Sequence, residues 1–133
     1  MLNYILLYLV VLASFFVIDM IWLGVVAKKF YKTQLGSMMA KKINWIAASI
    51  FYLLYIVGLI FFVINPALAQ GSWFYAFGTG ALFGLICYAT YDLSNLATLE
   101  NWPKKVTYVD LIWGSLLSAT LSTIGFLLGG IIF

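Results

Sequence analysis

Histidine is absent from the sequence, and cysteine occurs once, at Cys87. A single cysteine cannot form a disulfide within the chain, and structural zinc sites are built from cysteine and histidine ligands. We therefore expect no metal site and no cofactor, and we interpret Cys87, which lies in an apolar stretch, as inert packing. Charge is scarce as well, because Asp, Glu, Lys and Arg make up 8% of the residues, against roughly a quarter in soluble domains. This composition excludes an ordinary soluble domain.

Long apolar segments dominate the chain, since 65% of its residues are hydrophobic. A membrane-crossing helix requires roughly 17 to 25 apolar residues, and four segments reach this length, at residues 4–27, 44–65, 73–96 and 107–132. The first has no lysine or arginine before it and no convincing cleavage site, so we expect a retained helix and not a signal peptide. The sequence predicts an all-α membrane protein, with one four-helix transmembrane domain over residues 1–133.

The seven lysines indicate how the helices cross the membrane. Five lie between the first and second segments, and Lys104 and Lys105 lie between the third and fourth. Because lysine-rich loops stay in the cytoplasm, both loops are predicted to be cytoplasmic and both termini to lie outside. We expect a multi-pass protein of the bacterial inner membrane. Anionic lipid headgroups at the lysine loops account for the net charge of +3, and no nucleic acid partner is expected.

Two local similarities favour an internal repeat. KKINWI at residues 41–46 and KKVTYV at residues 104–109 share two lysines followed by β-branched, polar, aromatic and β-branched residues, and Asp19 or Asp92 lies in the segment before each run. This pattern favours two helical hairpins related by an axis along the membrane normal. The alternative is that any helix beginning at the cytoplasmic surface shows such residues.

Rows of small residues mark helix faces that can approach closely in a membrane. Such rows occur in the third segment at Ala76, Gly80 and Gly84, and in the fourth at Gly114, Ser118, Ser122, Gly125 and Gly129. We expect these rows to pack within the bundle. The alternative is that part of them forms a homodimer face.

FVIDMIWLG at residues 16–24 and TYVDLIWG at residues 107–114 each place an aspartate within an apolar segment. Together with Asp92, these acids are predicted to lie in the cytoplasmic half of the bilayer at overlapping depths. A nitrogen donor follows each acid by three residues, a spacing that shares a helix face. We therefore expect three hydrogen-bonded pairs, Asp19 with Trp22, Asp92 with Asn95, and Asp110 with Trp113.

Tyr88 and Tyr91 fall on the same helical stripe as Asp92 and Asn95, and a polar stripe in a membrane helix is expected to face the bundle interior. These four residues are candidate ligand-binding residues, together with Asp19, Trp22, Asp110 and Trp113. Structural alternatives remain open for two of the acids. Residues 107–110 match a capping box, so that Asp110 completes a helix start, and Asp92 with Asn95 holds two helices together.

FVIDMIWLGVVAKKFYKTQLG, FYLLYIVGLIFFV and YATYDLSNLATLENWP, which runs into KKVTYVDLIWG, together cover much of the chain. On these motifs and the four-segment layout, the sequence resembles the bacterial inner-membrane family catalogued as domain of unknown function 2177. YDLSNLATL, followed after two residues by WP, is the most specific part. The resemblance implies a small four-helix integral membrane protein of bacteria and implies no activity.

Three functions fit these observations. The one that we favour is an acid-lined cavity in the cytoplasmic half of the membrane that binds or transports a small cationic or amphipathic ligand, with or without coupled proton movement. Because one four-helix bundle is thin for enclosing a conduit, a homodimer is expected for this function. The alternatives are a membrane-embedded enzyme acting on a lipid headgroup, whose catalytic residues the sequence leaves unassigned, and a structural or accessory membrane subunit.

Overall fold

A computed structural model describes all 133 residues, and every regular element in it is a helix. Four helical stretches are long and apolar enough to cross a membrane, namely Leu2–Val26, Trp45–Gln70, Trp73–Thr98 and Lys104–Ile132. The prediction of an all-α membrane protein with four spanning helices is therefore confirmed. The α-helical elements are α1 (Leu2–Ile21), α2 (Lys28–Leu35), α3 (Trp45–Leu59), α4 (Asn65–Gln70), α5 (Trp73–Thr98) and α6 (Lys104–Ile132).

The second spanning stretch continues to Gln70, whereas the sequence predicted its end at residue 65. Pro66 falls in the first turn of α4, where a missing N–H is tolerated. The chain between α3 and α4 also widens into a π-helical segment, Ile60–Ile64, which relieves the backbone next to the proline. Gly71 then ends α4 in the left-handed conformation with φ +63°, so the turn into α5 is short.

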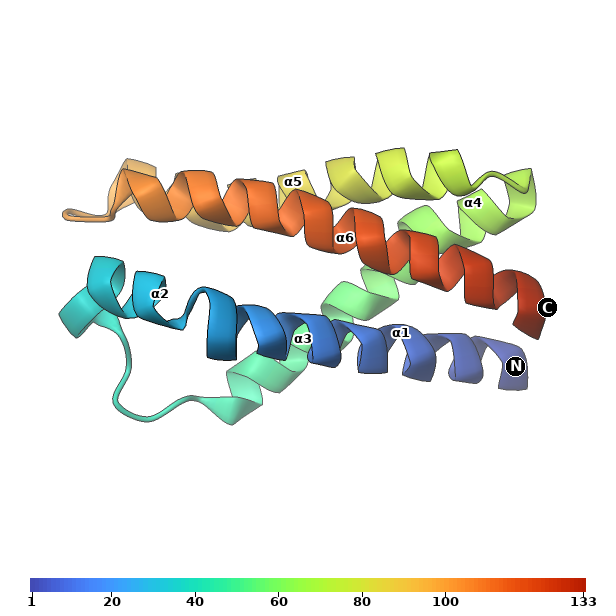
Figure 1. Cartoon of the computed structure of the whole chain (residues 1–133), viewed down its shortest axis with the longest axis horizontal. Coiled ribbons are helices and arrows are strands. Elements are labelled where there is room, and N and C mark those ends of the chain that lie inside the picture. The colour runs from blue at the N-terminus through green and yellow to red at the C-terminus, as the bar shows by residue number, and fades with distance from the viewer.

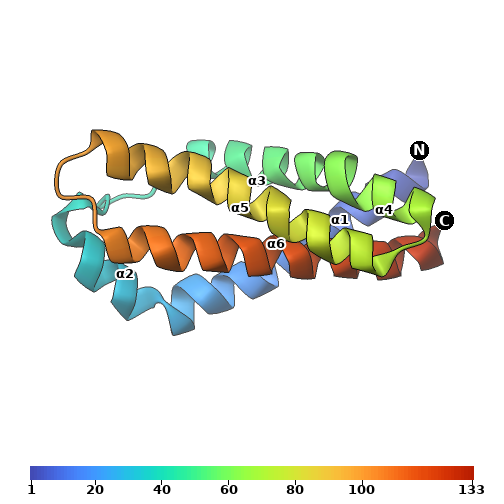
Figure 2. The same cartoon turned by 90° about the horizontal axis from the view of Figure 1, so that it is seen from above.

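Both chain termini lie at one end of the bundle, and α2 and the α5–α6 turn lie at the other (Figure 1). A view turned by 90° shows the same division (Figure 2). We call these the terminal end and the loop end. All the lysines belong to segments of the loop end. The side of the membrane to which each end belongs stays a prediction, and so does the two-hairpin repeat.

α5 and α6 form a close helix pair through their small residues. Gly80 is buried against Ser118 and Ser122, and a Cβ atom at Gly80 would lie only 2.8 Å from the carbonyl oxygen of Ser118. Gly125 gives similar room to the side chain of Ile64 in the second spanning stretch. The prediction that these rows pack within the bundle is therefore confirmed.

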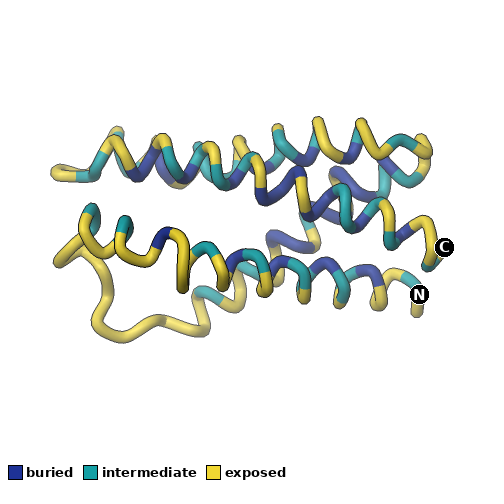
Figure 3. The backbone as a smooth tube through the Cα atoms, viewed as in Figure 1, coloured by how far each residue is buried: buried dark blue, intermediate teal, exposed yellow.

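The apolar core leaves the loop end of α3 unpacked. Residues 45–54 of α3 include no buried side chain, whereas the rest of the helix enters the core from Tyr55 onward. Residues 36–44, which join α2 to α3, are exposed throughout, as Figure 3 shows. The core consists of Leu7, Val11, Phe15, Tyr55, Ile56, Leu59, Ile60, Val63, Ile64, Leu117 and Leu121. The loop end of the bundle is therefore less densely packed than the core.

Candidate functional site

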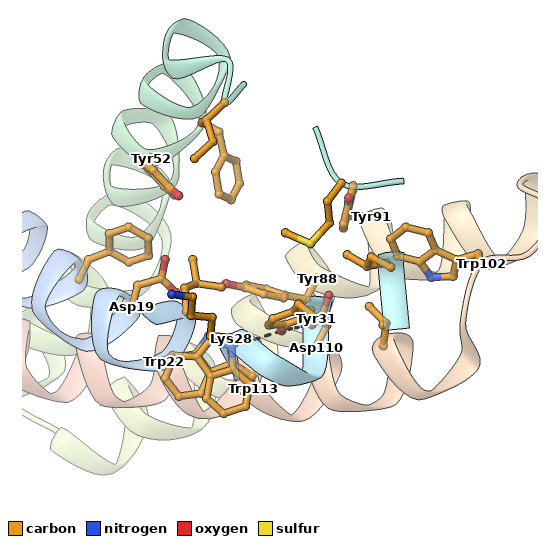
Figure 4. A pocket seen from close by; sticks show the side chains of 17 residues that line it. Asp19, Trp22, Lys28, Tyr31, Tyr52, Tyr88, Tyr91, Trp102, Asp110 and Trp113 are labelled. Atoms are coloured by element: carbon orange, nitrogen blue, oxygen red, sulfur yellow. Dashed lines mark hydrogen bonds between the residues drawn. The ribbon is translucent and has the colours of Figure 1, made fainter. Parts of the chain in front are cut away.

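A cavity of about 570 Å³ lies at the loop end, enclosed by residues of α1, α2, α3, α5 and α6 and of their connections. This volume is typical of small-molecule sites, which span roughly 300 to 1,000 Å³ and combine an apolar wall with a few polar groups. Aromatic rings make up much of the wall, as Figure 4 shows. The lining residues are Phe15, Asp19, Trp22, Leu23, Lys28, Tyr31, Leu35, Met39, Ile43, Phe51, Tyr52, Tyr88, Tyr91, Trp102, Val106, Asp110 and Trp113.

Asp19 of α1 and Asp110 of α6 bring carboxyl groups to this cavity from two separate helices (Figure 4). They are 5% and 7% exposed, respectively. An acid near the centre of a spanning helix costs about 2.5 to 3.5 kcal/mol on insertion scales, and such acids normally face a bundle interior or a cavity. Six of the eight residues predicted as ligand-binding line the cavity, the other four being Trp22, Tyr88, Tyr91 and Trp113. That they bind a ligand stays a prediction.

Asp110 is bound by Tyr31 of α2, a residue that the sequence did not single out. The Tyr31 hydroxyl donates to Oδ1 of Asp110 and accepts a hydrogen bond of 3.2 Å from Nε1 of Trp22. Burial raises the pKa of Tyr31 above its ordinary value, and the bond to Asp110 raises it further, because a phenolate would lose this bond and face a carboxylate. Tyr31 is therefore a neutral donor that ties α2 to α6.

The predicted bonds from each tryptophan to the acid three residues before it are wrong. Trp22 donates to Tyr31, and the buried Nε1 of Trp113 has no hydrogen-bond partner. The two indoles stack across the α1–α6 contact, with ring centroids 4.2 Å apart and planes 7° apart. Stacking fixes both rings along the cavity wall, and Nε1 of Trp113 faces Asp19 of the other helix without the geometry of a hydrogen bond.

Asp92 and Asn95, although predicted as ligand-binding residues, do not line the cavity. Asp92 is fully buried, and neither of its carboxyl oxygens has a hydrogen-bond partner. Its predicted bond to Asn95 is therefore wrong. The Asp92 carboxyl group lies near that of Asp110 on α6, whereas Asn95 lies near Tyr91 of its own helix. Asp92 is therefore buried outside the cavity lining, although its neighbour Asp110 belongs to that lining.

The predicted stripe on α5 only partly faces the bundle interior. Tyr88 reaches the cavity from inside, but Tyr91 is 58% exposed and lines the cavity from its rim. The capping alternative for Asp110 is wrong, because α6 begins at Lys104 and Asp110 lies beyond its first turn. Thr107 instead accepts a hydrogen bond of 3.0 Å from Nε1 of Trp102.

Three cavity residues come from α2, which the sequence presented only as a lysine-rich loop. Lys28, Tyr31 and Leu35 are spaced by three and four residues and therefore share one helix face. This spacing is visible in KKFYKTQL, but a segment with three lysines also fits a solvated connection. The Lys28 side chain extends toward Asp19 (Figure 4).

The cavity thus offers two carboxyl groups, one ammonium group, tyrosine hydroxyls and several aromatic faces. Across the chain, no group of three or more His, Cys, Asp or Glu side chains is placed to hold a metal ion. Carboxylates and aromatic faces both attract cations, and attraction to a ring is strongest where water is excluded. Chemically, this is a site suited to an organic cation with apolar parts.

Comparison with protein families identifies the family of the chain. The family described as "Predicted membrane protein (DUF2177)" matches residues 4–127, so the chain belongs to this family. Searches of curated proteins and of solved structures give no match. The family match supports a protein of the membrane and leaves its function to be inferred from the site.

Proposed function

We propose that this member of the DUF2177 family binds an amphipathic cation within the membrane. The cationic group of the ligand occupies the aromatic cavity between Asp19 and Asp110. The observation that carries this proposal is the meeting of two carboxyl groups, from different spanning helices, in one cavity with aromatic walls. Intramembrane acids arranged in this way are typical of cation or proton pathways.

The aromatic wall supports an organic cation over a metal ion. The stacked rings of Trp22 and Trp113, together with Tyr52 and Tyr88, present apolar faces that suit alkylated ammonium groups. A hydrated metal ion instead prefers several oxygen ligands at short distance. Lys28 lines the same cavity and extends toward Asp19, and its side chain moves aside when the ammonium group of the ligand enters (Figure 4).

Binding by carboxyl groups also links the ligand to protons. A carboxyl group must be ionised to hold a cation by charge, so a site that holds a proton while empty releases it when the cation binds. Reversal of this exchange at the opposite face of the membrane is the chemistry of a proton-linked transporter. We infer binding from the cavity, and transport is an extension of this inference. It is tested by measuring substrate-induced proton movement in proteoliposomes, which the Asp19→Asn variant should abolish.

A binding titration tests the proposal directly. Purified protein in a neutral maltoside detergent is titrated with dodecyltrimethylammonium, and the shift in thermal unfolding is measured. Asp19→Asn and Asp110→Asn should each weaken binding by about tenfold or more, equivalent to ~1.4 kcal/mol. The amide introduced by Asp110→Asn retains an oxygen that accepts the Tyr31 hydrogen bond, so the cavity wall is preserved. Glu100→Gln, which removes one charge in the exposed α5–α6 turn, is the matched control and should bind as the parent does. Equal binding by all variants would overturn the proposal.

The second candidate function is an enzyme acting on a lipid headgroup. Lys28, which lines the cavity beside two carboxyl groups, is the observation that favours it, because an ammonium group can hold a phosphate and a carboxyl group can move a proton. Stabilisation of the protein by glycerol phosphate, with loss of this effect in Lys28→Gln, would support the enzyme and contradict a site for cations.

A further inference from the structure

A second cavity, of about 480 Å³, adjoins the first on the side of α3 and α5. Its lining residues are Phe51, Cys87, Tyr88, Tyr91 and Asp110, and all of these except Cys87 also line the first cavity. The shared wall makes the two cavities neighbours, with Asp110 and Tyr88 at their common boundary. Cys87, interpreted from the sequence as inert packing, lies at the inner end of this second space.

The second cavity reaches the lipid-facing surface of the protein. Phe51 of α3 and Tyr91 of α5 form its wall and are 51% and 58% exposed. Figure 1 shows the loop end of α3 diverging from α5, in agreement with the absence of buried residues at positions 45–54. The space between these helices at the loop end is therefore open to the bilayer and not closed by side chains.

The depth of the cavity places it within the hydrocarbon region. Asp110 follows the first residue of α6, Lys104, by roughly 9 Å along the helix, and Cys87 precedes the last residue of α5, Thr98, by roughly 16 Å. A half-open apolar space at this depth is surrounded by acyl chains and not by water. Only Asp110 among its lining residues carries a charge.

We propose that the ligand is a single-chain cationic amphiphile that arrives laterally from the bilayer between α3 and α5. Its alkyl chain lies in the second cavity along Phe51, Cys87 and Tyr91, and its headgroup passes Asp110 into the first cavity. This inference rests on the proposed function, because it assigns the chain of a ligand whose headgroup the first cavity holds. A small water-soluble cation would leave the second cavity unused.

Cys87 is the only cysteine and therefore a built-in reporter of this cavity. The experiment measures the rate at which N-ethylmaleimide alkylates Cys87 in protein reconstituted into phosphatidylglycerol nanodiscs. Dodecyltrimethylammonium should slow alkylation about tenfold, while tetramethylammonium, which has the headgroup without the chain, should leave the rate unchanged. The matched control is Cys87→Ala combined with Leu93→Cys, because Leu93 lies on the same helix, is exposed and lines neither cavity. Its alkylation should be insensitive to both cations.

A substitution that fills the second cavity gives an independent measurement. Cys87→Phe should weaken binding of dodecyltrimethylammonium about tenfold and leave binding of tetramethylammonium unchanged. Leu93→Phe, at an exposed position of the same helix that lines neither cavity, is the matched control and should change neither. If both cations bind in an Asp19-dependent manner but Cys87 is not protected and Cys87→Phe has no selective effect, the lateral chain site is wrong and the proposed function stands. If neither cation shows binding that depends on Asp19 or Asp110, the proposed function itself fails.

Discussion

The two ends of the bundle are packed differently. At the terminal end, glycine and serine rows of α5 and α6 meet at backbone distance, and the second spanning stretch fills the remaining space with buried Val63 and Ile64. At the loop end, aromatic side chains leave a cavity of about 570 Å³ that contains two carboxyl groups. The difference shows that close packing is concentrated toward the terminal end, while the space that our proposal assigns to a ligand lies at the loop end.

The hydrogen bonds follow the same division. Tyr55 and Ser118 are bonded within the core, whereas the bonds of Trp22, Tyr31 and Asp110 lie along a cavity wall. A bond within a packed core stabilises one arrangement of helices. A bond on a cavity wall can be exchanged for a bond or a charge contact to a ligand. Substitutions in the packed core should therefore mainly lower stability, whereas substitutions in the cavity wall should mainly change ligand binding.

The largest expected effect comes from closing the glycine contact. In Gly84→Ala, the added Cβ would overlap the carbonyl oxygen of Gly114 and the side chain of Ser118, and the backbone atom cannot move away without separating the two helices. We expect destabilisation of about 3 kcal/mol, the upper part of the range for overpacking. The measurement is reversible unfolding in mixed detergent micelles. Gly78→Ala on the same helix is the control, since nothing lies within 4 Å of its added Cβ, and it should be neutral or slightly stabilising. Equal losses would show that the α5–α6 contact is not the strongest part of the fold.

The second effect compares large-to-small changes at the two ends. Leu117→Ala removes a side chain that is 1% exposed in the core and should cost about 2 kcal/mol, because contacts are lost and the surrounding helices relax only partly. Met39→Ala removes an exposed side chain from the cavity wall and should cost less than about 0.5 kcal/mol. Thermal unfolding of the two variants in one detergent provides the comparison. A costly Met39→Ala would mean that the loop end is packed as firmly as the core.

The sequence predicted the packed end better than the cavity end. The glycine and serine rows repeat along one helix face, and helix periodicity is sufficient to locate them, so Gly80 and Ser118 were placed correctly before the fold was known. The positions of Asp19 and Asp110 at a shared depth followed from the helix rise. Their partners did not follow, because Tyr31 reaches Asp110 only when α2 packs against α6, a contact between residues far apart in the sequence.

The π-helical segment after α1 is a second reason why the sequence did not predict the hydrogen-bond partners at the cavity. Residues 22–26 form bonds of longer spacing, including the 2.7 Å bond from the Ala27 N–H to the Trp22 carbonyl, and this changes the direction of the residues that follow. Extrapolation of a regular α-helix through Trp22 therefore fails at the site. The sequence also could not predict that Asp92 lacks a hydrogen-bond partner. The polar stripe on α5 indicates which helix face is polar, but it does not indicate whether a partner lies on the facing helix.

The third prediction concerns Asp92, which lies on α5 toward the loop end and lines neither cavity. Its carboxyl group is fully buried without a hydrogen-bond partner, and such a group costs roughly 1 to 3 kcal/mol in lost hydration. Asp92→Asn keeps the shape and replaces the acid next to Asp110 with a group that cannot ionise, so we expect stabilisation by about 1 kcal/mol. The measurement is the free energy of unfolding of the variant, with Asn95→Asp as a control that alters charge on the same helix outside this contact. Destabilisation by Asp92→Asn would show that the acid has a partner in the membrane.

Tyr31→Phe is expected to affect a single short helix, and its effect should appear mainly in α2. The change removes one hydrogen bond to Asp110, and the net value of such a bond is about 0.5 to 1.5 kcal/mol. Because α2 has no buried side chain of its own, this loss should raise amide hydrogen exchange in Lys28–Leu35 while exchange in α5 and α6 stays unchanged. Tyr108→Phe, an exposed tyrosine of α6, is the matched control and should leave exchange in α2 as it is.

Tyr31 also makes the docking of α2 against α6 depend on pH. The pKa of Tyr31 is raised above its ordinary value of 10.0 in the folded protein, so the unfolded or undocked chain releases this proton first. The stabilisation from docking is therefore complete below pH 10 and declines as the pH rises beyond it. Hydrogen exchange of α2, corrected for the intrinsic pH dependence of exchange, should increase in the parent protein above this pH and show no such step in Tyr31→Phe. A step of equal size in the variant would mean that another group titrates when α2 undocks. Tyr31 would then line the cavity without holding α2 against α6.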